Sequence, residues 1–378
     1  MHIAYGFGGA EQTTANLLNY LDRHRIHRIT LAAPAVLKPY LPDKYDDFID
    51  VTAKGLHGGF SSARGLYQQA RLAAGLLRET VPDLALGMMH YPSALVALGA
   101  KLAGVPTRVV ASYRGPFYEY MRYHEHGFRR CLFLWTAVAG AARLADRVIV
   151  PSQGTVTELQ QRFFTPKHKS VAIPNGIDLA LVERDADMAV PELVDLVDDS
   201  TPVLCAAARL VPEKNFGLLL EAFRQVRAQR PAILLILGDG SERARLERKI
   251  ASWELNNAVR FIGYRANIMP YLRRADMFIH TCLFEGFGYT LLEALACGTA
   301  VISTDCPYGP YEVLDGGQYG ILTPPGDSSA LAVAILRLID DPAGRQALIK
   351  KGLERAQQLS AQRMVKAYEN EFLSLVAA

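Results

Sequence analysis

Residues 284–295 read Phe284-Glu285-Gly286-Phe287-Gly288-Tyr289-Thr290-Leu291-Leu292-Glu293-Ala294-Leu295. The apolar run just before them, at 276–282, predicts a short buried strand. Leucine and alanine at helical spacing predict a helix that begins at Gly288 or Tyr289. The glycines at the junction allow a sharp turn and leave amide groups uncovered at the helix start, which is a favourable place for an anion.

Two carboxylates flank this predicted anion site. Glu285 lies in the turn and Glu293 lies in the helix, eight positions later. That spacing would be about 12 Å along a helix, too far for both side chains to hold one group. We therefore predict two separate hydrogen-bond acceptors on either side of an anion, which is the layout of a nucleoside diphosphate sugar. The alternative is an ordinary strand–turn–helix with two solvated glutamates.

The pattern Glu-x7-Glu within Glu-Gly-Phe-Gly-x-x-Leu-Leu-Glu-Ala-Leu resembles the signature of family-4 retaining glycosyltransferases, which have the two-domain GT-B fold. The resemblance implies that Glu285 binds hydroxyls of the donor sugar and Glu293 binds the ribose. It also implies donor contacts from the residues between them, Gly286, Phe287, Gly288, Tyr289, Thr290 and Leu291.

Composition indicates a globular chain of two domains. Its 378 residues exceed one comfortable domain, and half of them are hydrophobic. A formal net charge of only +3 argues against a dedicated nucleic-acid-binding protein. The first 183 residues carry 20 Lys and Arg against 14 Asp and Glu, so this half is the basic one.

The five cysteines lack Cys-x-x-Cys spacing, which indicates reduced thiols and neither a disulfide framework nor a zinc site. No signal peptide is visible, because Met1 leads directly into a predicted strand at 2–5. The longest apolar run, 131–142, is too short to cross a bilayer about 30 Å thick. We therefore predict a cytoplasmic protein in which nothing crosses the membrane.

Short apolar strands alternate with helices in both halves, which predicts doubly wound parallel sheets. In such sheets ligands bind at the carboxyl ends of the strands. The predicted strands are 2–5, 28–33, 84–89, 108–112, 147–152, 170–176, 203–208, 233–237, 259–263 and 300–305, and helices are predicted at 12–21, 61–79, 93–103, 216–229, 242–253, 327–339, 344–359 and 361–376.

The chain opens on a glycine-rich turn between a short strand and a helix. Gly8 and Gly9 lie in Gly6-Phe7-Gly8-Gly9-Ala10-Glu11, a loop that can face a phosphate. Many α/β proteins begin in this way. The segment also resembles the Gly-Gly-Ala-Glu start of family-4 enzymes, which implies that Gly8 and Gly9 bind the donor.

Three residues after predicted strands are candidates for binding the acceptor. His90 and Tyr91 follow one strand and Arg114 follows the next. A lone histidine after a strand is as often structural as functional, and both interpretations of His90 stay open. Many family relatives have a histidine where this chain has Ser112-Tyr113-Arg114, so that role cannot be transferred. An arginine suits an anionic acceptor such as a lipid pyrophosphate.

Aromatic and basic residues are interleaved in residues 117–130. Such a segment can lie on a membrane, with its rings at headgroup depth and its arginines on anionic lipid. This interpretation predicts peripheral contact of the N-terminal half with the inner face of the cytoplasmic membrane. An amphipathic helix packed on its own domain is the alternative.

An acidic run at 178–202 is the predicted domain boundary. Asp185-Ala186-Asp187 matches the metal-binding acidic pair of the other glycosyltransferase fold only superficially, since no strand flanks it, and we assign no metal. Beyond the run, Arg209 and Lys214 lie between a strand and a helix, where both can contact one diphosphate. They resemble the family's Arg-x4-Lys, which implies a role on the leaving group; solvated charge is the alternative.

The resemblance covers nearly the whole chain and is strongest between residues 203 and 327, where 309–314 also resembles the Gly-Pro-x-Glu-Ile-Leu segment of bacterial enzymes that extend lipid-linked saccharides. It implies GT-B architecture, with two Rossmann-like domains facing across a cleft. We predict an acceptor-binding domain at 1–183, a nucleotide-sugar-binding domain at 184–360, and a final helix at 361–378 that returns to the first domain.

The predicted reaction moves a sugar, a hexose or N-acetylhexosamine, from a UDP-sugar to a hydroxyl of a saccharide or lipid-linked saccharide, with retained configuration. UDP is implied by the resemblance alone. Fixed positive groups, Arg209, Lys214 and the helix amides, would stabilise the departing diphosphate. The expectation is therefore an enzyme that uses no metal or other cofactor, with Glu285, Arg209 and Lys214 as catalytic residues.

Three other functions stay open. A GT-B epimerase or hydrolase would share the donor site but need no acceptor. A non-catalytic saccharide- or lipid-binding relative would release no UDP. An NAD-binding dehydrogenase fits poorly, because no Gly-x-Gly-x-x-Gly follows a strand with an acid about 20 residues later.

Overall fold

The computed structural model describes residues 1–2, 8–59, 62–190 and 201–377, and the chain divides into two compact units. Unit 1 comprises Met1–Gly176 and Ala361–Ala378, and unit 2 comprises Ile177–Ser360. The division falls seven residues before the boundary predicted at 183. The amide of Ile177 donates to the carbonyl of Leu359 at 2.9 Å, so the chain enters and leaves unit 2 at one place.

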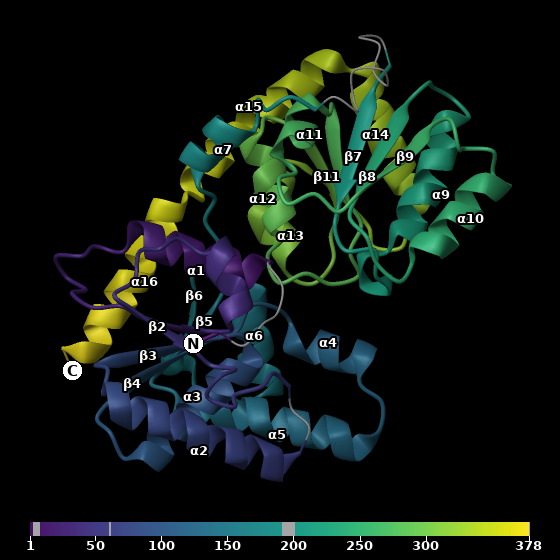
Figure 1. Ribbon diagram of the computed structural model, residues 1–378. Helices are drawn as coiled ribbons and strands as arrows, with labels where there is room; N and C mark the ends of the chain where they lie inside the picture. Colours follow the sequence, from purple (N-terminus) through teal and green to yellow (C-terminus); the bar gives the residue numbers. More distant parts are fainter. Residues whose placement is uncertain (3–7, 60–61, 191–200, 378) are drawn as a thin grey trace. The chain divides into compact units, whose positions relative to one another are not determined.

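Unit 1 is built on parallel strands (Figure 1). Its described residues form a four-stranded sheet in the order β3-β4-β5-β6 and a two-stranded sheet of β1 and β2. The strands are β1 (Thr30–Ala33), β2 (Asp47–Asp50), β3 (Leu84–Met88), β4 (Arg108–Ser112), β5 (Arg147–Val150) and β6 (Ser170–Ala172); the helices are α1 (Gly9–Tyr20), α2 (Ala63–Thr80), α3 (His90–Ala103), α4 (Phe117–His124), α5 (Phe128–Leu144), α6 (Gln153–Arg162) and α16 (Ala361–Val376).

Alternate residues of the central strand β4 enter different cores, which is why this segment is apolar throughout. Val109 and Ala111 pack on the face covered by α2, α3 and α5, whereas Val110 packs on the face covered by α1 and α16. The final helix α16 contributes Val365 and Tyr368 to the second core and belongs to unit 1.

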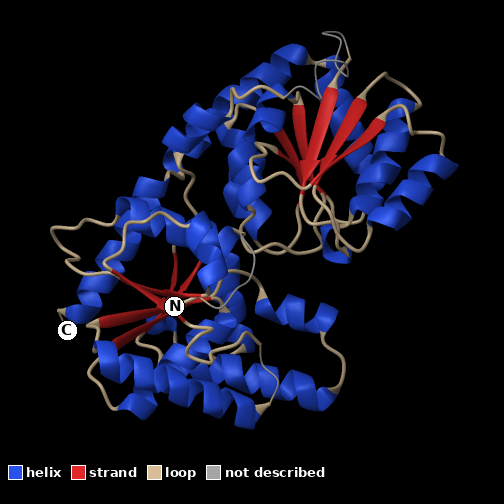
Figure 2. Cartoon of the chain, in the orientation of Figure 1, coloured by secondary structure: helices blue, strands red, loops and turns tan. Residues whose placement is uncertain are grey.

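Unit 2 contains a six-stranded parallel sheet among its described residues, in the order β12-β11-β10-β7-β8-β9. Figure 2 shows helices on both faces of this sheet. The strands are β7 (Val203–Ala207), β8 (Ile233–Leu237), β9 (Val259–Gly263), β10 (Met277–His280), β11 (Ala300–Thr304) and β12 (Ile321–Thr323); the helices are α7 (Leu179–Asp185), α9 (Phe216–Arg227), α10 (Arg243–Ser252), α11 (Met269–Arg274), α12 (Tyr289–Ala296), α13 (Gly309–Val313), α14 (Ser328–Asp340) and α15 (Pro342–Gln358).

The strand order of unit 2 reverses beside β7. From β7 the chain runs outward through β8 and β9, then returns to pair β10 on the other side of β7. In a doubly wound sheet this switch point is where loops after neighbouring strands diverge and leave room for a ligand. Leu204 and Cys205 of β7 enter separate cores on the two faces, so the sheet is buried on both sides.

The parallel α/β architecture predicted for both domains is confirmed, and that they face one another across a cleft stays a prediction. Residues 3–5 of the strand predicted at 2–5, the helix start at residue 61 and residues 191–200 of the acidic run lie outside the described residues. Strand β2 was not predicted, because Asp47-Phe48-Ile49-Asp50 is bounded by acids and is only half buried. Among the described residues, no helix is both long and apolar enough to span a bilayer.

Candidate active site

The switch point of unit 2 brings together two of the predicted catalytic residues. Lys214 ends the loop that follows β7, and Glu285 lies in the loop that follows β10. These loops are hydrogen bonded to each other, because the Thr281 hydroxyl donates to the carbonyl of Lys214 at 3.0 Å. The amide of Leu283 donates to the carbonyl of Glu213 at 2.9 Å. These hydrogen bonds therefore hold the two loops, and with them Lys214 and Glu285, next to each other.

Lys214 and Glu285 form a largely buried ion pair. Lys214 Nζ lies 2.6 Å from Glu285 Oε2, with the two side chains 18% and 21% exposed. Burial opposes both charges, but Cys282 and Glu285 raise the pKa of the Lys214 ammonium above its usual range. Likewise, Lys214 and His280 hold the pKa of the Glu285 carboxyl well below its usual range despite the burial.

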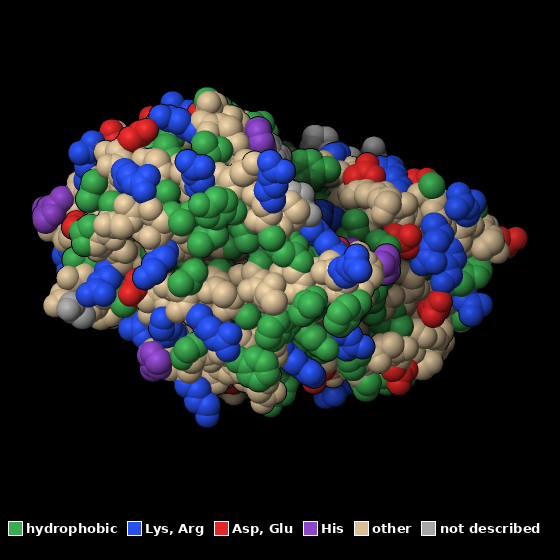
Figure 3. Space-filling view, turned by 90° about the horizontal axis from the view of Figure 1, so that it is seen from below, with side chains coloured by type: hydrophobic (Ala, Val, Ile, Leu, Met, Phe, Trp, Pro, Cys, Tyr) green, Lys and Arg blue, Asp and Glu red, His purple; other side chains and the backbone are tan. Residues whose placement is uncertain are grey.

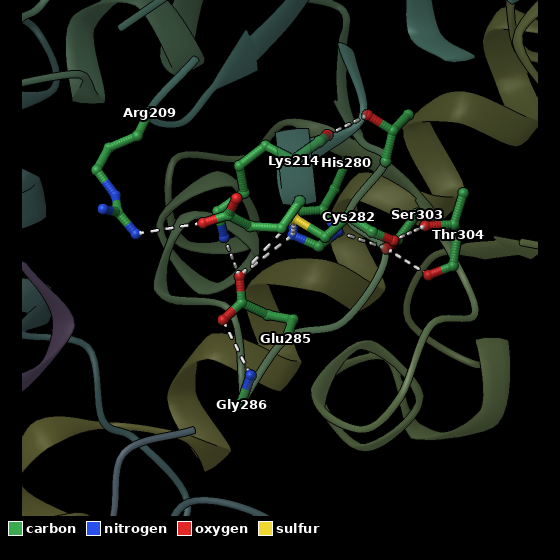
Figure 4. A network of polar contacts seen from close by, with 10 residues as sticks. Arg209, Lys214, His280, Cys282, Glu285, Gly286, Ser303 and Thr304 are labelled. Atoms are coloured by element: carbon green, nitrogen blue, oxygen red, sulfur yellow. Dashed lines mark hydrogen bonds and ion pairs between the residues drawn. The ribbon is translucent and has the colours of Figure 1, made fainter. Parts of the chain in front are cut away.

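His280 and Cys282 complete a polar network around the Glu285 carboxylate (Figure 4). His280 Nε2 lies 3.7 Å from Glu285 Oε2 and 3.0 Å from Cys282 Sγ, and the thiol lies 3.9 Å from the same carboxylate oxygen. Burial opposes the imidazolium, but Cys282 and Glu285 raise the pKa of His280 to about 9. Two cationic side chains thus face one carboxylate oxygen.

The other side of the His280 ring is anchored by β11. Its Nδ1 lies 3.0 Å from the hydroxyl of Ser303, which donates its own proton to the carbonyl of Thr304 at 2.9 Å. Since a hydroxyl has a single proton, the Nδ1–H of His280 must donate to Ser303. This assigns the proton on Nδ1 and directs Nε2 toward Cys282 and Glu285.

A close backbone contact shapes the turn that carries Glu285. The carbonyl of Glu285 accepts hydrogen bonds from the amides of Tyr308 and Gly309, at 2.8 and 3.0 Å. A Cβ on Gly309 would lie 2.3 Å from the Cα of Phe287, so only glycine fits there. The segment after β11, at 308–309, therefore packs against the turn and holds the backbone of Glu285 in place.

Helix α12 begins at Tyr289, as predicted, after Gly288 with a φ of 97°. No side chain caps the helix start. Of the amides around Gly288–Leu291 that were expected to be uncovered, that of Leu291 donates to the carbonyl of Gly288 at 3.2 Å. The positive end of the helix dipole still points toward the turn that contains Glu285 and Gly286.

Glu293 lies one turn further along α12, and its side chain is partly buried. Burial raises the pKa of Glu293 to about 7. Glu285 and Glu293 thus have opposite pKa shifts, since Glu285 has cationic neighbours. Both side chains are partly buried, and that of Glu285 is 21% exposed.

Arg209 lies at the edge of this network. Its side chain is 76% exposed, and its Nη2 lies 3.8 Å from Glu213 Oε1 (Figure 4). It lies two residues after the end of β7, in the same loop as Lys214. Arg209 therefore lies beyond the carboxyl end of β7, where ligands bind in such sheets, and its ion pair is with Glu213 and not with Glu285.

The candidate residues of unit 1 lie at the start of α1 and beyond β3 and β4. Gly9 is the first residue of α1, and the carbonyl of Gly8 accepts the amide of Gln12 at 2.9 Å. His90 opens α3, next to Met89, which has a φ of 72° that is rare for a residue other than glycine. Tyr91 is buried, and burial raises its pKa to about 12.

His90 stacks on two aromatic rings, with centroids 4.9 Å from Tyr113 and 4.2 Å from Phe117. Burial lowers its pKa to about 3, so the ring is neutral near pH 7. Its Nε2 is buried and has no hydrogen-bond partner among the described residues. The stacking agrees with a structural role for His90, and the unpaired Nε2 agrees with a ligand-binding role. Both interpretations of His90 therefore stay open.

Arg114 is held by neutral groups from three other parts of unit 1. Its guanidinium donates to the Tyr368 hydroxyl of α16 at 2.9 Å, to the Thr13 hydroxyl of α1 at 2.7 Å and to Asn175 Oδ1 after β6. Arg114 therefore joins α1, α16 and the sheet. Its contact with an anionic acceptor stays a prediction.

Comparison with known families accounts for both units. The family described as "Glycosyltransferase Family 4" matches residues 7–181, and "Glycosyl transferases group 1" matches residues 194–355. Together these matches cover most of both units. The chain belongs to the family-4 glycosyltransferases, which have the GT-B fold.

Individual glycosyltransferases support this assignment. An uncharacterized glycosyltransferase of Methanocaldococcus jannaschii is 27% identical over 60% of this chain and 63% of its own length. The N-acetylgalactosamine-N,N'-diacetylbacillosaminyl-diphospho-undecaprenol 4-alpha-N-acetylgalactosaminyltransferase of Campylobacter jejuni is 25% identical over 93% of this chain and 92% of its own. The crystal structure of HepE of Anabaena in complex with UDP matches 98% of both chains, with a TM-score of 0.80 and 21% identity.

The sequence patterns of this glycosyltransferase did not indicate four site residues, His280, Cys282, Ser303 and Thr304. A signal was available, since each lies at or just beyond the carboxyl end of a central strand, where ligands bind in such sheets. These residues were assigned to a buried strand because the surrounding run is apolar.

Proposed function

We propose that this glycosyltransferase moves a hexose or N-acetylhexosamine from a UDP-sugar to a hydroxyl of a saccharide or lipid-linked saccharide, with retention of the anomeric configuration. The observation that carries the proposal is the preformed Lys214–Glu285 pair at the switch point of unit 2, next to the start of α12. The HepE structure with UDP and the Campylobacter transferase for a diphospho-undecaprenol-linked saccharide support the two substrate classes.

In this proposal the positive groups of unit 2 bind the donor diphosphate. Breaking the bond to the sugar builds negative charge on the leaving phosphate, and Lys214, Arg209 and the α12 start lie where they can stabilise it. Each preorganised donor of this kind is typically worth ~3 kcal/mol of activation free energy. Because the loops are bonded to one another, little reorganisation accompanies the reaction.

Glu285 and Glu293 hold the two ends of the donor. The ionised Glu285 accepts hydrogen bonds from sugar hydroxyls, with Lys214 and His280 keeping its charge. Glu293 accepts from the ribose, which favours its ionised form. No metal is part of this proposal, and the departing phosphate oxygen takes the acceptor proton on the same face of the sugar.

The acceptor contacts come from unit 1. We assign them to His90, Tyr91 and Arg114, beyond the carboxyl ends of β3 and β4. The unpaired His90 Nε2 can bond one acceptor hydroxyl. Gly8 and Gly9 at the start of α1 would contact the donor.

Contact with an anionic membrane is the last part of the proposal. Phe128 and Leu132 lie one helical turn apart on α5, and they are 80% and 48% exposed. Arg122 and Arg129 are exposed on the same segment. In Figure 3, hydrophobic side chains are interspersed with Lys and Arg on the face seen from below. Apolar side chains among arginines suit the interface of an anionic bilayer.

Turnover with defined substrates tests the whole proposal. A thermal-shift screen of nucleoside diphosphates selects the nucleotide, and UDP release is then measured with a panel of UDP-sugars and soluble or lipid-linked acceptors. NMR of the product gives the anomeric configuration. Free sugar or an epimer without acceptor would identify a hydrolase or epimerase instead, and UDP binding without turnover on any donor would identify a non-catalytic relative.

A further inference from the structure

Three side chains around the donor carboxylate have the composition of a zinc site. His280, Cys282 and Glu285 fall within six residues, and their Nε2, Sγ and Oε2 atoms all lie within 4.8 Å of one another. His280 and Cys282 are 4% and 3% exposed. This is the one group of three or more potential metal ligands found in the described ranges. Nitrogen, thiolate and carboxylate ligands together favour zinc over magnesium or calcium.

The distances fit a shared metal after small side-chain rotations. With bonds of about 2.0 Å to nitrogen and oxygen and 2.3 Å to sulfur, the ligand atoms of a tetrahedral zinc site lie about 3.3–3.6 Å apart. The observed separations are 3.0 Å between sulfur and nitrogen, 3.7 Å between nitrogen and oxygen, and 3.9 Å between sulfur and oxygen. Each is within about 0.6 Å of that geometry.

The histidine is already oriented as a metal ligand. Its Nδ1–H donates to Ser303, which donates in turn to the Thr304 carbonyl, so Nε2 is the ring nitrogen that can bind a metal once its own proton has left. Zinc-binding histidines characteristically donate their second ring nitrogen in this way. Ser303 thus has the position of an outer partner, supplied by the neighbouring strand β11.

One cation already occupies the region that a metal would enter. Lys214 Nζ lies 2.6 Å from the Glu285 oxygen that belongs to the cluster. An ammonium ion and a divalent metal repel each other, so both cannot bind that oxygen. Metal binding must therefore displace Lys214 from Glu285.

We propose that His280, Cys282 and Glu285 form an inhibitory site for Zn²⁺ or a similarly thiophilic divalent cation. Binding forms zinc–sulfur and zinc–nitrogen bonds, and the thiol proton of Cys282 and the Nε2 proton of His280 leave to solvent. The Lys214–Glu285 pair opens, and Glu285 is no longer available for a sugar hydroxyl. The inhibitory effect rests on the proposed function, whereas the binding of zinc does not.

Zinc binding to the tag-free full chain can be measured without turnover, by competition with a chromophoric chelator. Cobalt(II) serves as a spectroscopic probe, because a thiolate ligand gives a sulfur-to-cobalt charge-transfer band. We expect Cys282→Ser to abolish that band and to weaken zinc binding by about 100-fold or more. Ser303→Ala should weaken it by about tenfold, which is typical for loss of an outer partner. Cys131→Ser, at a half-buried thiol of unit 1, is the matched control and should change nothing.

A gain of affinity provides the sharper test. Lys214→Met removes the competing ammonium and should tighten zinc binding by about tenfold. The same change removes a residue that is proposed to bind the diphosphate of the sugar donor. Loss of folding would not produce that result. With wild-type protein, zinc should inhibit transfer and excess UDP-sugar should weaken zinc binding.

Several outcomes would overturn the proposal. Zinc affinity that is lost in Cys131→Ser and kept in Cys282→Ser would place the metal on the Cys131 thiol of unit 1. Weaker binding in Lys214→Met would show that the lysine does not compete. If zinc bound with the expected ligands while sugar transfer continued, the site would not be inhibitory. If the chain bound zinc but had no transferase activity, only the proposed function would be contradicted.

Discussion

Lys214 Nζ lies 2.6 Å from Glu285 Oε2, although the two residues are 71 positions apart in the chain. Adjacent pairing of β7 with β10 brings them together, and direct hydrogen bonds between the two loops hold them there. A buried ion pair is weak evidence of stabilisation, because desolvation offsets the attraction between the charges. Its position at the switch point instead indicates a binding site whose two charges are fixed in advance.

Lys214→Ala tests the leaving-group role. Because the proposed donor site loses a fixed cation, we expect kcat for sugar transfer to fall by at least about 100-fold, with the fold intact by circular dichroism. Lys249→Ala is the control, since Lys249 forms a surface pair with Glu221 at a similar 2.7 Å. Near-normal turnover in Lys214→Ala would remove this residue from the mechanism.

Glu285→Ala separates sugar recognition from nucleotide binding. We expect transfer to be abolished because the sugar hydroxyls lose their acceptor, while calorimetry still detects UDP binding through the rest of unit 2. UDP affinity that disappears together with turnover would show that Glu285 acts on the nucleotide or on the fold. Transfer at the wild-type rate would contradict the assignment altogether.

Glu293 gives a prediction about pH. Its folded pKa of about 7 lies above the ordinary value of 4.5, so the folded state holds the proton more tightly than the unfolded chain. The stabilisation that this group contributes is complete below about pH 4.5 and is lost as the pH rises through about 7. We therefore expect the Tm of Glu293→Gln, relative to the wild type, to increase between pH 5 and pH 8.

The same Glu293→Gln variant should bind UDP more weakly at pH 8 by calorimetry. A residue that lowers the stability of the fold but raises the affinity for a ligand is characteristic of a functional site. If the variant lost stability at every pH and bound UDP normally, Glu293 would have a structural role only.

Gly309→Ala tests the backbone support of Glu285. The added methyl group would lie 2.3 Å from the Phe287 Cα and 2.4 Å from its carbonyl oxygen, so the turn must move. We expect a lower Tm and a loss of transfer together. Gly140→Ala is a control of opposite sign: the added Cβ meets nothing within 4 Å, and α5 gains about 1 kcal/mol of helix propensity. Unchanged transfer in Gly309→Ala would mean that the turn tolerates the displacement.

Strands buried on both faces were the easiest elements to predict from sequence. The segments 108–112 and 233–237 have the predicted bounds, because their buried residues form short apolar runs. Strand β2 gave no such signal, since it is short and half buried. Periodicity locates what is buried, and it is silent where a strand gains stability mainly from pairing.

The candidate site was predictable only in part for a related reason. Glycines and charges in the loops indicated Glu285, Lys214 and Gly288, whereas His280 and Cys282 were assigned to an apolar strand. Their contacts with Glu285 depend on where the chain turns after β10, and with Ser303 on the register between β10 and β11. A single sequence does not specify that register. For the same reason, the hydrogen bonds of Arg114 to α1 and α16 could not be foreseen.

Membrane contact through α4 and α5 is testable with vesicles. We expect the protein to sediment with vesicles of phosphatidylcholine and phosphatidylglycerol at low salt, and less with phosphatidylcholine alone, because each arginine near an anionic surface contributes about 1 kcal/mol. Replacing both Phe128 and Leu132 with serine should lower the partition coefficient by about tenfold, since their side chains are 80% and 48% exposed and would insert among the lipids.

Val333→Ser is the matched control for this experiment, because Val333 is a 65% exposed apolar residue on α14 of unit 2. Arg122→Gln with Arg129→Gln should weaken binding to the anionic vesicles and reduce its dependence on salt. The membrane role of α5 would be excluded if the Val333 variant lost as much vesicle binding as the Phe128 and Leu132 variant. It would also be excluded if the protein bound equally to both vesicle types. An acceptor carried on lipid would then have to reach unit 1 without this surface.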